Sequence, residues 1–207
     1  MPELPDVEVF RQRLAEHSLN SEIEEVEVKD ERILKDITPR TFASRLSGRR
    51  FIATSRHGKY CFVEVDGRIG WLVLHFGMTG TVTTVQSRED MPRHGAARFV
   101  LASGSDLVYI SKRKLGFIRL IQDREAFIQE QKLGPDPMDP SFDRETFLDL
   151  LAKRKGRLKT AFMNQSLLAG IGNVYADEIL FQAGLHPGVK ISDLSREQLG
   201  HVYETMN

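Results

Sequence analysis

The sequence contains a single cysteine, Cys61, among 207 residues. One cysteine excludes an intramolecular disulfide and also a metal site built from several cysteines. Cys61 stands in the apolar run Tyr60–Val65, which is typical of a small buried hydrophobic residue rather than a reactive thiol. We therefore expect this chain to bind no metal and no other cofactor.

Long apolar runs are missing as well. No stretch approaches the roughly 18 apolar residues that a membrane-spanning helix needs. The first residues, Met-Pro-Glu-Leu-Pro-Asp, contain no basic segment followed by an apolar one, as a signal peptide would. We therefore expect a cytoplasmic protein with no membrane partner.

The chain has no net charge, with 29 Lys and Arg against 29 Asp and Glu, but these charges are unevenly distributed. Residues 1–36 hold eleven acidic and five basic residues, so this segment carries −6 and the remainder carries +6. The basic residues of the remainder gather in three segments, Arg49–Lys59, Lys112–Arg119 and Lys153–Lys159. Nucleic-acid phosphates require such a basic face, although each segment alone is more often a solvated surface.

Residues 22–121 contain short runs of β-branched and aromatic residues between turn signals, which predicts a β-sandwich or barrel. Asp66-Gly67 and Ser103-Gly104-Ser105 separate such runs and predict hairpin turns. A helix is expected ahead of them from Pro5, with the apolar stripe Val7, Phe10 and Leu14. The predicted strands are Arg50–Ser55, Tyr60–Val65, Ile69–His75, Thr81–Val85, Arg98–Leu101, Leu107–Ile110 and Phe117–Ile121.

Helical periodicity replaces the strand pattern after about residue 142. Gly134–Pro140 is rich in proline and predicts a rigid connector. Helices are expected at 143–154, 157–164, 173–183 and 195–206, the last opened by a capping box of Ser195 and Gln198. We therefore predict an α+β chain. It has a β-sandwich domain with a leading helix over 1–133, a linker at 134–142 and an all-helical domain over 143–207.

The first candidate for chemistry is Pro2. Removal of Met1 would leave Pro2 as a secondary amine, and a terminal amine with a pKa of about 8 is partly unprotonated and nucleophilic near neutral pH. The helix predicted to begin at once would hold this amine and the adjacent Glu3 in place. In an arbitrary protein Met-Pro-Glu is more often a solvated terminus, so this interpretation needs support elsewhere in the chain.

The segment Gln165–Phe181 gives that support. Gly170 and Gly172 predict a tight turn ahead of a helix, where backbone N–H groups and the helix N-terminus can hold a phosphate. Asn173, at the predicted cap, can donate a side-chain hydrogen bond, and Lys159 lies in the basic run upstream. A glycine-rich helix cap without a ligand is the alternative, but the basic run favours a clamp for a nucleic-acid backbone.

Five motifs follow one another along the chain: Pro2–Glu8, Gly58–Tyr60, His75–Gly80, Gly134–Pro137 and Gln165–Phe181. Together, and in this order, they resemble the motifs of the formamidopyrimidine-DNA glycosylase / endonuclease VIII family. The opening Glu-Leu-Pro is closer to the formamidopyrimidine branch. The resemblance implies a β-sandwich, then a helix–two-turn–helix domain, with damaged double-stranded DNA in the cleft between them. It further implies a monomeric, nucleoid-associated enzyme of base-excision repair that removes oxidised purines such as 8-oxoguanine and formamidopyrimidines.

The resemblance also implies a role for each site residue. Pro2 would attack C1′ of the damaged nucleoside to expel the base and form a Schiff base, with Glu3 as general acid and base. Lys59 would hold a phosphate and support strand cleavage by β- and then δ-elimination. The space left by the flipped base would be filled by Met78, Arg113 and Leu115, although Met78 could instead be a core residue. The remaining DNA contacts would come from Asp6, His75, Lys159, Gly172 and Asn173.

Two features depart from the family pattern. Ser111–Gly116 stands where relatives commonly have Asp-Pro-Arg-Arg-Phe-Gly, so Leu115 replaces an aromatic wedge and Arg113 loses acidic support. The four-cysteine zinc ribbon of the family has no counterpart, so we expect a truncated chain and zinc only in a missing C-terminal part. A non-catalytic DNA-binding relative or an inactive fragment therefore stays an alternative. A tautomerase that uses a terminal proline as its base is disfavoured, because such subunits are short.

Overall fold

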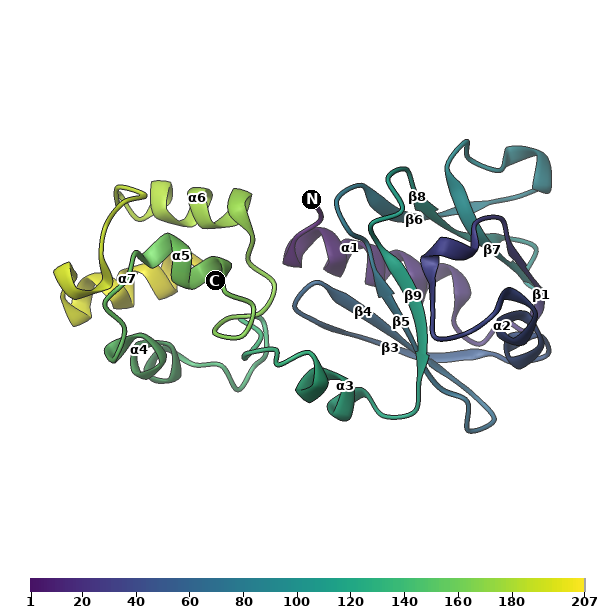
Figure 1. Cartoon of the computed structure of the whole chain (residues 1–207), viewed down its shortest axis with the longest axis horizontal. Helices are drawn as coiled ribbons and strands as arrows, with labels where there is room; N and C mark the ends of the chain where they lie inside the picture. Colours follow the sequence, from purple (N-terminus) through teal and green to yellow (C-terminus); the bar gives the residue numbers. More distant parts are fainter. Residues whose placement is uncertain (207) are drawn as a thin grey trace. The chain divides into compact units, whose positions relative to one another are not determined.

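A computed structural model of the chain describes residues 1–206, apart from the side chain of Arg88. The chain divides into two compact units, Met1–Phe127 and Ile128–Asn207 (Figure 1). The first is a β-sandwich with a leading helix and the second is all-helical, so the predicted α+β class is confirmed. The predicted linker at 134–142 lies inside the second unit. Within residues 1–206 no helix combines the length and the apolar character needed to cross a membrane.

Two sheets form the first unit. One has the strand order β1-β7-β8-β6, and the other has the order β2-β9-β5-β4-β3, in which only the β2–β9 pair is parallel. The seven predicted strands are confirmed as β3 to β9, with ends that differ by a few residues. The strands are β1 (Ile23–Val28), β2 (Leu34–Lys35), β3 (Phe51–His57), β4 (Tyr60–Val65), β5 (Gly70–His75), β6 (Gly80–Val85), β7 (Gly95–Leu101), β8 (Asp106–Ser111) and β9 (Phe117–Ile121).

The core of the sandwich is built from alternate residues of these strands. Cys61 is fully buried there, and burial raises the pKa of its thiol to about 12, as expected for an inert hydrophobic residue. Helix α2 (Pro39–Leu46), which the sequence analysis did not predict, adds Phe42 to this core. The Phe42 ring lies 6.1 Å from that of Phe99 in an edge-on contact.

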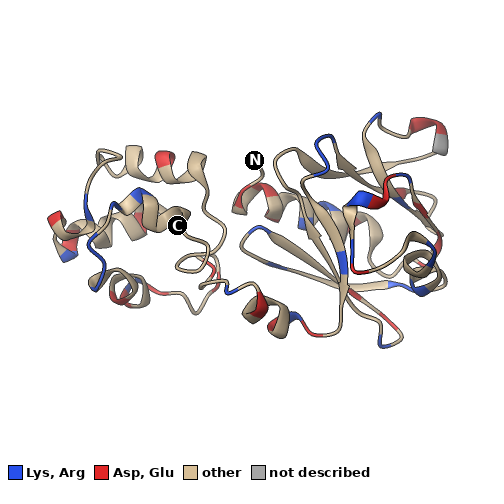
Figure 2. Ribbon diagram, in the orientation of Figure 1, with Lys and Arg blue, Asp and Glu red and all other residues tan. Residues whose placement is uncertain are grey.

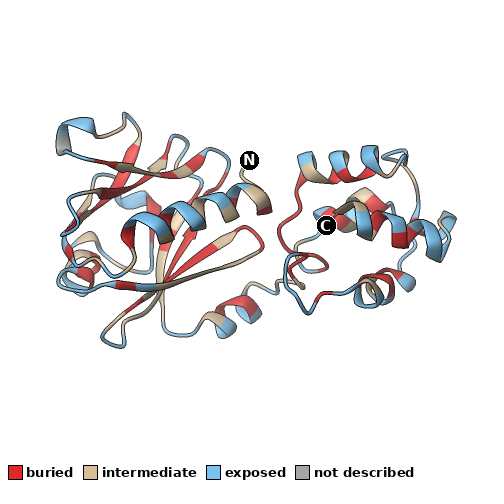
Figure 3. Cartoon of the chain, turned by 180° about the vertical axis from the view of Figure 1, so that it is seen from behind, coloured by how far each residue is buried: buried red, intermediate tan, exposed pale blue. Residues whose placement is uncertain are grey.

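The predicted leading helix is confirmed as α1 (Leu4–Ser18). It contacts β3 and β4 of one sheet and β6 and β8 of the other, so it is anchored to both layers of the sandwich. Val7 and Leu14 are fully buried, and the Phe10 ring contacts the Phe76 ring at 4.8 Å. The opposite face of α1 is exposed (Figure 3). The apolar stripe therefore fixes the start of this helix against the sandwich.

The second unit has its own core around Phe147, Phe162 and Leu180. Its helices confirm the four predicted ones, and Ser195 and Gln198 form the predicted capping box with hydrogen bonds of 2.9 and 3.1 Å. A further helix, α3 (Arg124–Glu130), was not predicted, and the boundary between the two units falls within it. The other helices are α4 (Arg144–Ala152), α5 (Leu158–Met163), α6 (Asn173–Gln182) and α7 (Arg196–Met206).

One buried ion pair joins β7 to β8. Arg98 is 7% exposed and Asp106 is 5% exposed, and Arg98 Nε donates to Asp106 Oδ2 at 2.7 Å. The second oxygen, Asp106 Oδ1, accepts the Leu101 backbone N–H at 3.3 Å. A buried charge is tolerated only while its partner is present.

We predict that Asp106→Asn destabilises the protein, because it removes the nearer carboxylate of the buried Arg98 and leaves only Glu27, at 3.6 Å, to balance its charge. The free energy of unfolding should fall by about 3 kcal/mol in urea denaturation at pH 7. Glu24→Gln, an exposed change on β1, is the control and should change that free energy by less than about 0.5 kcal/mol. Equal effects of the two variants would contradict a stabilising role for the ion pair.

Candidate active site

The start of α1 places Pro2 and Glu3. Glu3 is the residue that precedes the helix, and its backbone N–H donates to Asp6 Oδ2 at 2.8 Å. Pro5 lies in the first turn, where its missing N–H costs nothing. Glu3 is only 2% exposed. Asp6 therefore helps to fix the end of the chain, and its assignment as a DNA contact stays a prediction.

Lys59 is placed by the turn between β3 and β4. Gly58 has a φ of +56°, which residues with a side chain rarely adopt, so Gly58-Lys59 can close a two-residue hairpin. Lys59 is only 9% exposed. Burial lowers the pKa of Lys59, and the negative charge of Glu3 opposes that shift. The structure thus brings Glu3 and Lys59, 56 positions apart in the sequence, into electrostatic contact.

His75, at the end of β5, lies beside Lys59. Its ring packs against those of Tyr60 and Phe117, at centroid distances of 5.0 and 5.3 Å. Burial is the main reason that the pKa of His75 falls to about 4, and the charge of Lys59 adds to the effect. Its buried Nδ1 has no hydrogen-bond partner among the described residues. At neutral pH this imidazole is therefore uncharged, and it can share a small site with the Lys59 ammonium.

Met78, Arg113 and Leu115 come together on one edge of the sandwich. Arg113 Nη1 lies 3.6 Å from Met78 Sδ, and Met78 and Leu115 are 44% and 52% exposed. The alternative that Met78 is a core residue is therefore wrong. Gly77 permits the close approach of the two loops, because a Cβ there would lie 2.5 Å from the backbone N of Gly116.

An ion pair that the sequence analysis missed holds the second of these loops. Lys114 Nζ lies 3.7 Å from Asp30 Oδ2, and Lys114 has the unusual φ of +53° for a non-glycine residue. The Arg32 guanidinium beside Asp30, with help from Lys114, holds the pKa of that carboxyl at about 2. Asp30 is therefore ionised at neutral pH and steadies the loop between Arg113 and Leu115.

In the second unit, Gln165 braces the glycine-rich turn. Its Nε2 donates to the Ile171 carbonyl at 2.7 Å, and its Oε1 accepts from the Gly170 backbone N–H at 2.9 Å. Gly172 is the N-cap of α6, and Asn173 is the first helical residue rather than the cap that the sequence predicts. The reason is that Gly172 is the last residue with extended backbone. Asn173 is exposed.

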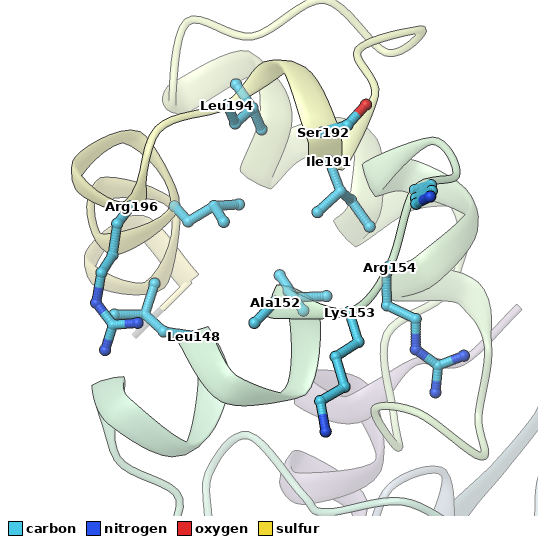
Figure 4. Close-up of a pocket in the computed structure, with 11 residues that line it drawn as sticks. Leu148, Ala152, Lys153, Arg154, Ile191, Ser192, Leu194 and Arg196 are labelled. Carbon is cyan, nitrogen blue, oxygen red and sulfur yellow. The ribbon is translucent and has the colours of Figure 1, made fainter.

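Lys159 is engaged within the protein. Its ammonium lies 2.7 Å from Asp177 Oδ1 and 2.9 Å from Oδ2, a partner that the sequence analysis did not identify. The rest of the basic run, between α4 and α5, is exposed (Figure 2). Lys153 and Arg154 also border a pocket of about 380 Å³, but their side chains extend away from its apolar lining of residues such as Leu148 (Figure 4). These cations are therefore available to an extended anion rather than to a ligand in the pocket.

The zinc site of the resembled family does not fit the residues present. Across residues 1–206 no group of three or more His, Cys, Asp or Glu side chains could hold a metal ion. Cys61, the one cysteine of the sequence, is buried in the sandwich. We therefore assign no step of the chemistry to a metal.

Comparison with known proteins covers both units. A family model described as the formamidopyrimidine-DNA glycosylase N-terminal domain matches residues 1–118, and one described as the H2TH domain of the same enzyme matches residues 133–207. The formamidopyrimidine-DNA glycosylase of Moorella thermoacetica is 34% identical over 208 residues, which are all of this chain and 76% of the relative. That of Heliobacterium modesticaldum is 38% identical and covers 99% of this chain and 75% of the relative.

Solved structures give the same result. A Lactococcus lactis formamidopyrimidine-DNA glycosylase bound to DNA with an abasic site matches with a TM-score of 0.89 and 27% identity. The match covers 99% of this chain and 78% of that one. A mutant of the same enzyme in complex with DNA that contains Fapy-dG matches with the same TM-score. The similarity extends over both units of the chain.

We predict that His75 makes stability depend on pH. Its imidazole has a pKa of about 4 in the folded protein against 6.5 when unperturbed, so only the unfolded chain takes up this proton between those values. Stability should therefore fall as pH falls from 6.5 to 4, by on the order of 2–3 kcal/mol from this group. Urea denaturation of the wild type and His75→Gln across pH 4–7 tests this, and parallel curves for the two would refute it.

Proposed function

The chain belongs to the formamidopyrimidine-DNA glycosylase family, and we propose that it removes oxidised bases from DNA and then cuts the strand. It is a DNA glycosylase of base-excision repair that acts on damaged double-stranded DNA. The proposed chemistry rests on one observation. Glu3, at the start of the helix that presents Pro2, is close enough to Lys59 for its charge to act on the Lys59 ammonium.

The first step uses the nitrogen of Pro2. After removal of Met1, its lone pair bonds to C1′ of the damaged nucleoside while the bond from C1′ to the base breaks. Glu3 acts as the general acid and base for the leaving base and the sugar ring oxygen. Opening of the ring gives an iminium, the Schiff base, which a secondary amine forms without losing a second proton. With Met1 attached, the same nitrogen is an amide and cannot attack.

The second step cuts the strand. The Schiff base acidifies the C2′ protons, and loss of one expels the 3′ phosphate by β-elimination, after which δ-elimination expels the 5′ phosphate. Lys59 holds a backbone phosphate during these steps. Its buried position favours this role, because a partly desolvated ammonium binds a phosphate more strongly than a hydrated one does. The uncharged His75 beside it can contact the same phosphate.

The exposed apolar side chains of Met78 and Leu115 fill the space that the flipped base leaves in the DNA double helix. Arg113 faces the partner base that has lost its pair. On the second unit, Gly172 and Asn173 hold a phosphate at the N-terminus of α6. Lys159 contributes its positive charge nearby, but must share it with Asp177. We further propose that the enzyme acts as a monomer in the cytoplasm, at the nucleoid.

We predict that Pro2→Gly separates binding from chemistry. The wild type, with Met1 removed as checked by intact mass, should form a borohydride-trapped covalent complex with abasic-site DNA. In Pro2→Gly the trapped complex and base release should fall by about 100-fold or more, because the secondary amine is gone. Affinity for duplex DNA should change little. If the processed wild type is not trapped at low salt, the chain is a non-catalytic DNA-binding relative.

The class of lesion is tested separately. Because related L. lactis structures contain abasic-site or Fapy-dG DNA, we expect oxidised purines to be cut faster than oxidised pyrimidines. A panel of duplexes with single lesions and each opposite base measures this preference. Faster cleavage of oxidised pyrimidines than of oxidised purines would refute this lesion class.

Arg113→Ala should lower discrimination between opposite bases by roughly tenfold, as one lost base contact does. The same panel of duplexes measures this change.

A further inference from the structure

A buried arginine of β3 connects the helix that carries Pro2 and Glu3 with the turn that carries Lys59. Arg56 Nε donates to Glu8 Oε2 on α1 at 3.2 Å, and Arg56 Nη1 donates to the Gly58 carbonyl at 3.1 Å. The Arg56 side chain is 6% exposed and that of Glu8 is 19% exposed. One guanidinium therefore bridges two elements that meet only in the folded protein.

We propose that Arg56 is a positioning residue for the glycosylase and strand-cleavage chemistry. It sets the distance between the Pro2 nitrogen and the Lys59 ammonium. The proposal rests on the function proposed above, but the contacts that carry it do not involve the reacting groups. Glu8 lies on α1, five residues after the N-cap Glu3, or about 7.5 Å along the axis. Gly58 is the residue before Lys59, so its carbonyl moves with the turn.

Only a guanidinium suits this bridge. Its planar group donates from Nε and from Nη1 in fixed directions, so it can hold a carboxylate and a carbonyl at the same time. An ammonium of Lys would hold one acceptor well and the other poorly. Because Arg56 is buried, solvent cannot replace either contact without a shift of the turn or of the helix.

A neighbouring arginine provides a matched control. Arg11 lies on α1 and donates to Glu8 at 2.6–3.1 Å and to Thr54 Oγ1 at 2.9 Å. Its contact with Thr54 ties α1 to β3, whereas its contacts with Glu8 lie within α1 and use the same carboxylate that Arg56 binds. The contacts found for Arg11 do not include the Gly58-Lys59 turn. Loss of Arg11 should weaken the attachment of α1 and leave the turn in place.

The test compares Arg56→Met with Arg11→Met, with Met1 removed from both proteins. Strand cleavage at an abasic site should fall roughly tenfold or more in kcat for Arg56→Met, since a displacement of about 1 Å can cost 100-fold. Arg11→Met should stay within about twofold of the wild type, and both should bind an uncleavable abasic-site analogue about equally well. Arg56→Lys should lie between Arg56→Met and the wild type.

A second readout does not depend on activity. Reductive ¹³C-methylation of the lysines, with Lys59→Arg to assign the signal, reports the surroundings of Lys59 by NMR. Arg56→Met should shift the Lys59 signal, whereas Arg11→Met should not. Glu8→Gln, which keeps an oxygen acceptor, guards against an Arg56→Met protein that does not fold, and should shift the signal in the same direction.

The outcomes separate the two proposals. If the wild type neither traps nor cuts DNA, the proposed function fails, and the NMR comparison alone then decides whether Arg56 positions Lys59. If the wild type is active but both Met variants lose the same activity and shift the Lys59 signal equally, Arg56 merely stabilises the fold. An Arg56→Met protein with unchanged kcat and an unchanged Lys59 signal also overturns the proposal.

Discussion

The arrangement of the first unit depends on the burial of opposite charges at one point. Glu3 and Lys59 are both largely withdrawn from solvent, and the negative charge of Glu3 offsets part of the cost of burying the Lys59 ammonium. The start of α1 and the β3–β4 turn must therefore keep a fixed separation. Asp6 fixes the first turn of the helix, and the low pKa of His75 avoids a second positive charge beside Lys59. The same constraint that stabilises the fold prepares the site for chemistry.

The two units supply different parts of the proposed reaction. The first unit carries the proposed nucleophile and acid–base group at the start of α1, which packs against both sheets, and the exposed loop of Met78 after β5. The helical unit offers backbone N–H groups at Gly172 and exposed cations, which hold a polyanion of any sequence. Since phosphate contacts position DNA and do not select a base, the base contacts proposed for this chain, at Met78, Arg113 and Leu115, all lie in the sandwich.

The periodic elements could be predicted from the sequence, and most contacts between them could not. Hydrophobic alternation located β3 to β9, and Ser195 with Gln198 marked the last helix. Helix α2 was missed although Thr38-Pro39 is a usable start signal, since Thr38 accepts the Thr41 N–H. The pairing of Arg56 with Glu8 joins residues 48 positions apart. No local sequence pattern marks such a pair, because it forms only when α1 packs against β3.

The two exposed loops that carry Met78 and Leu115 are also held by rigid support. Met78 and Leu115 are 44% and 52% exposed, so these two hydrophobic side chains add little to the core of the sandwich. Their loops are nevertheless held in place, by the close approach at Gly77 and by the Lys114–Asp30 ion pair. A rigid, exposed apolar pair loses little entropy on binding, which would favour its burial in the opened base step of the proposed complex. Leu115 is smaller than the phenylalanine expected there from the family resemblance, and in the proposed complex it would fill that step less completely.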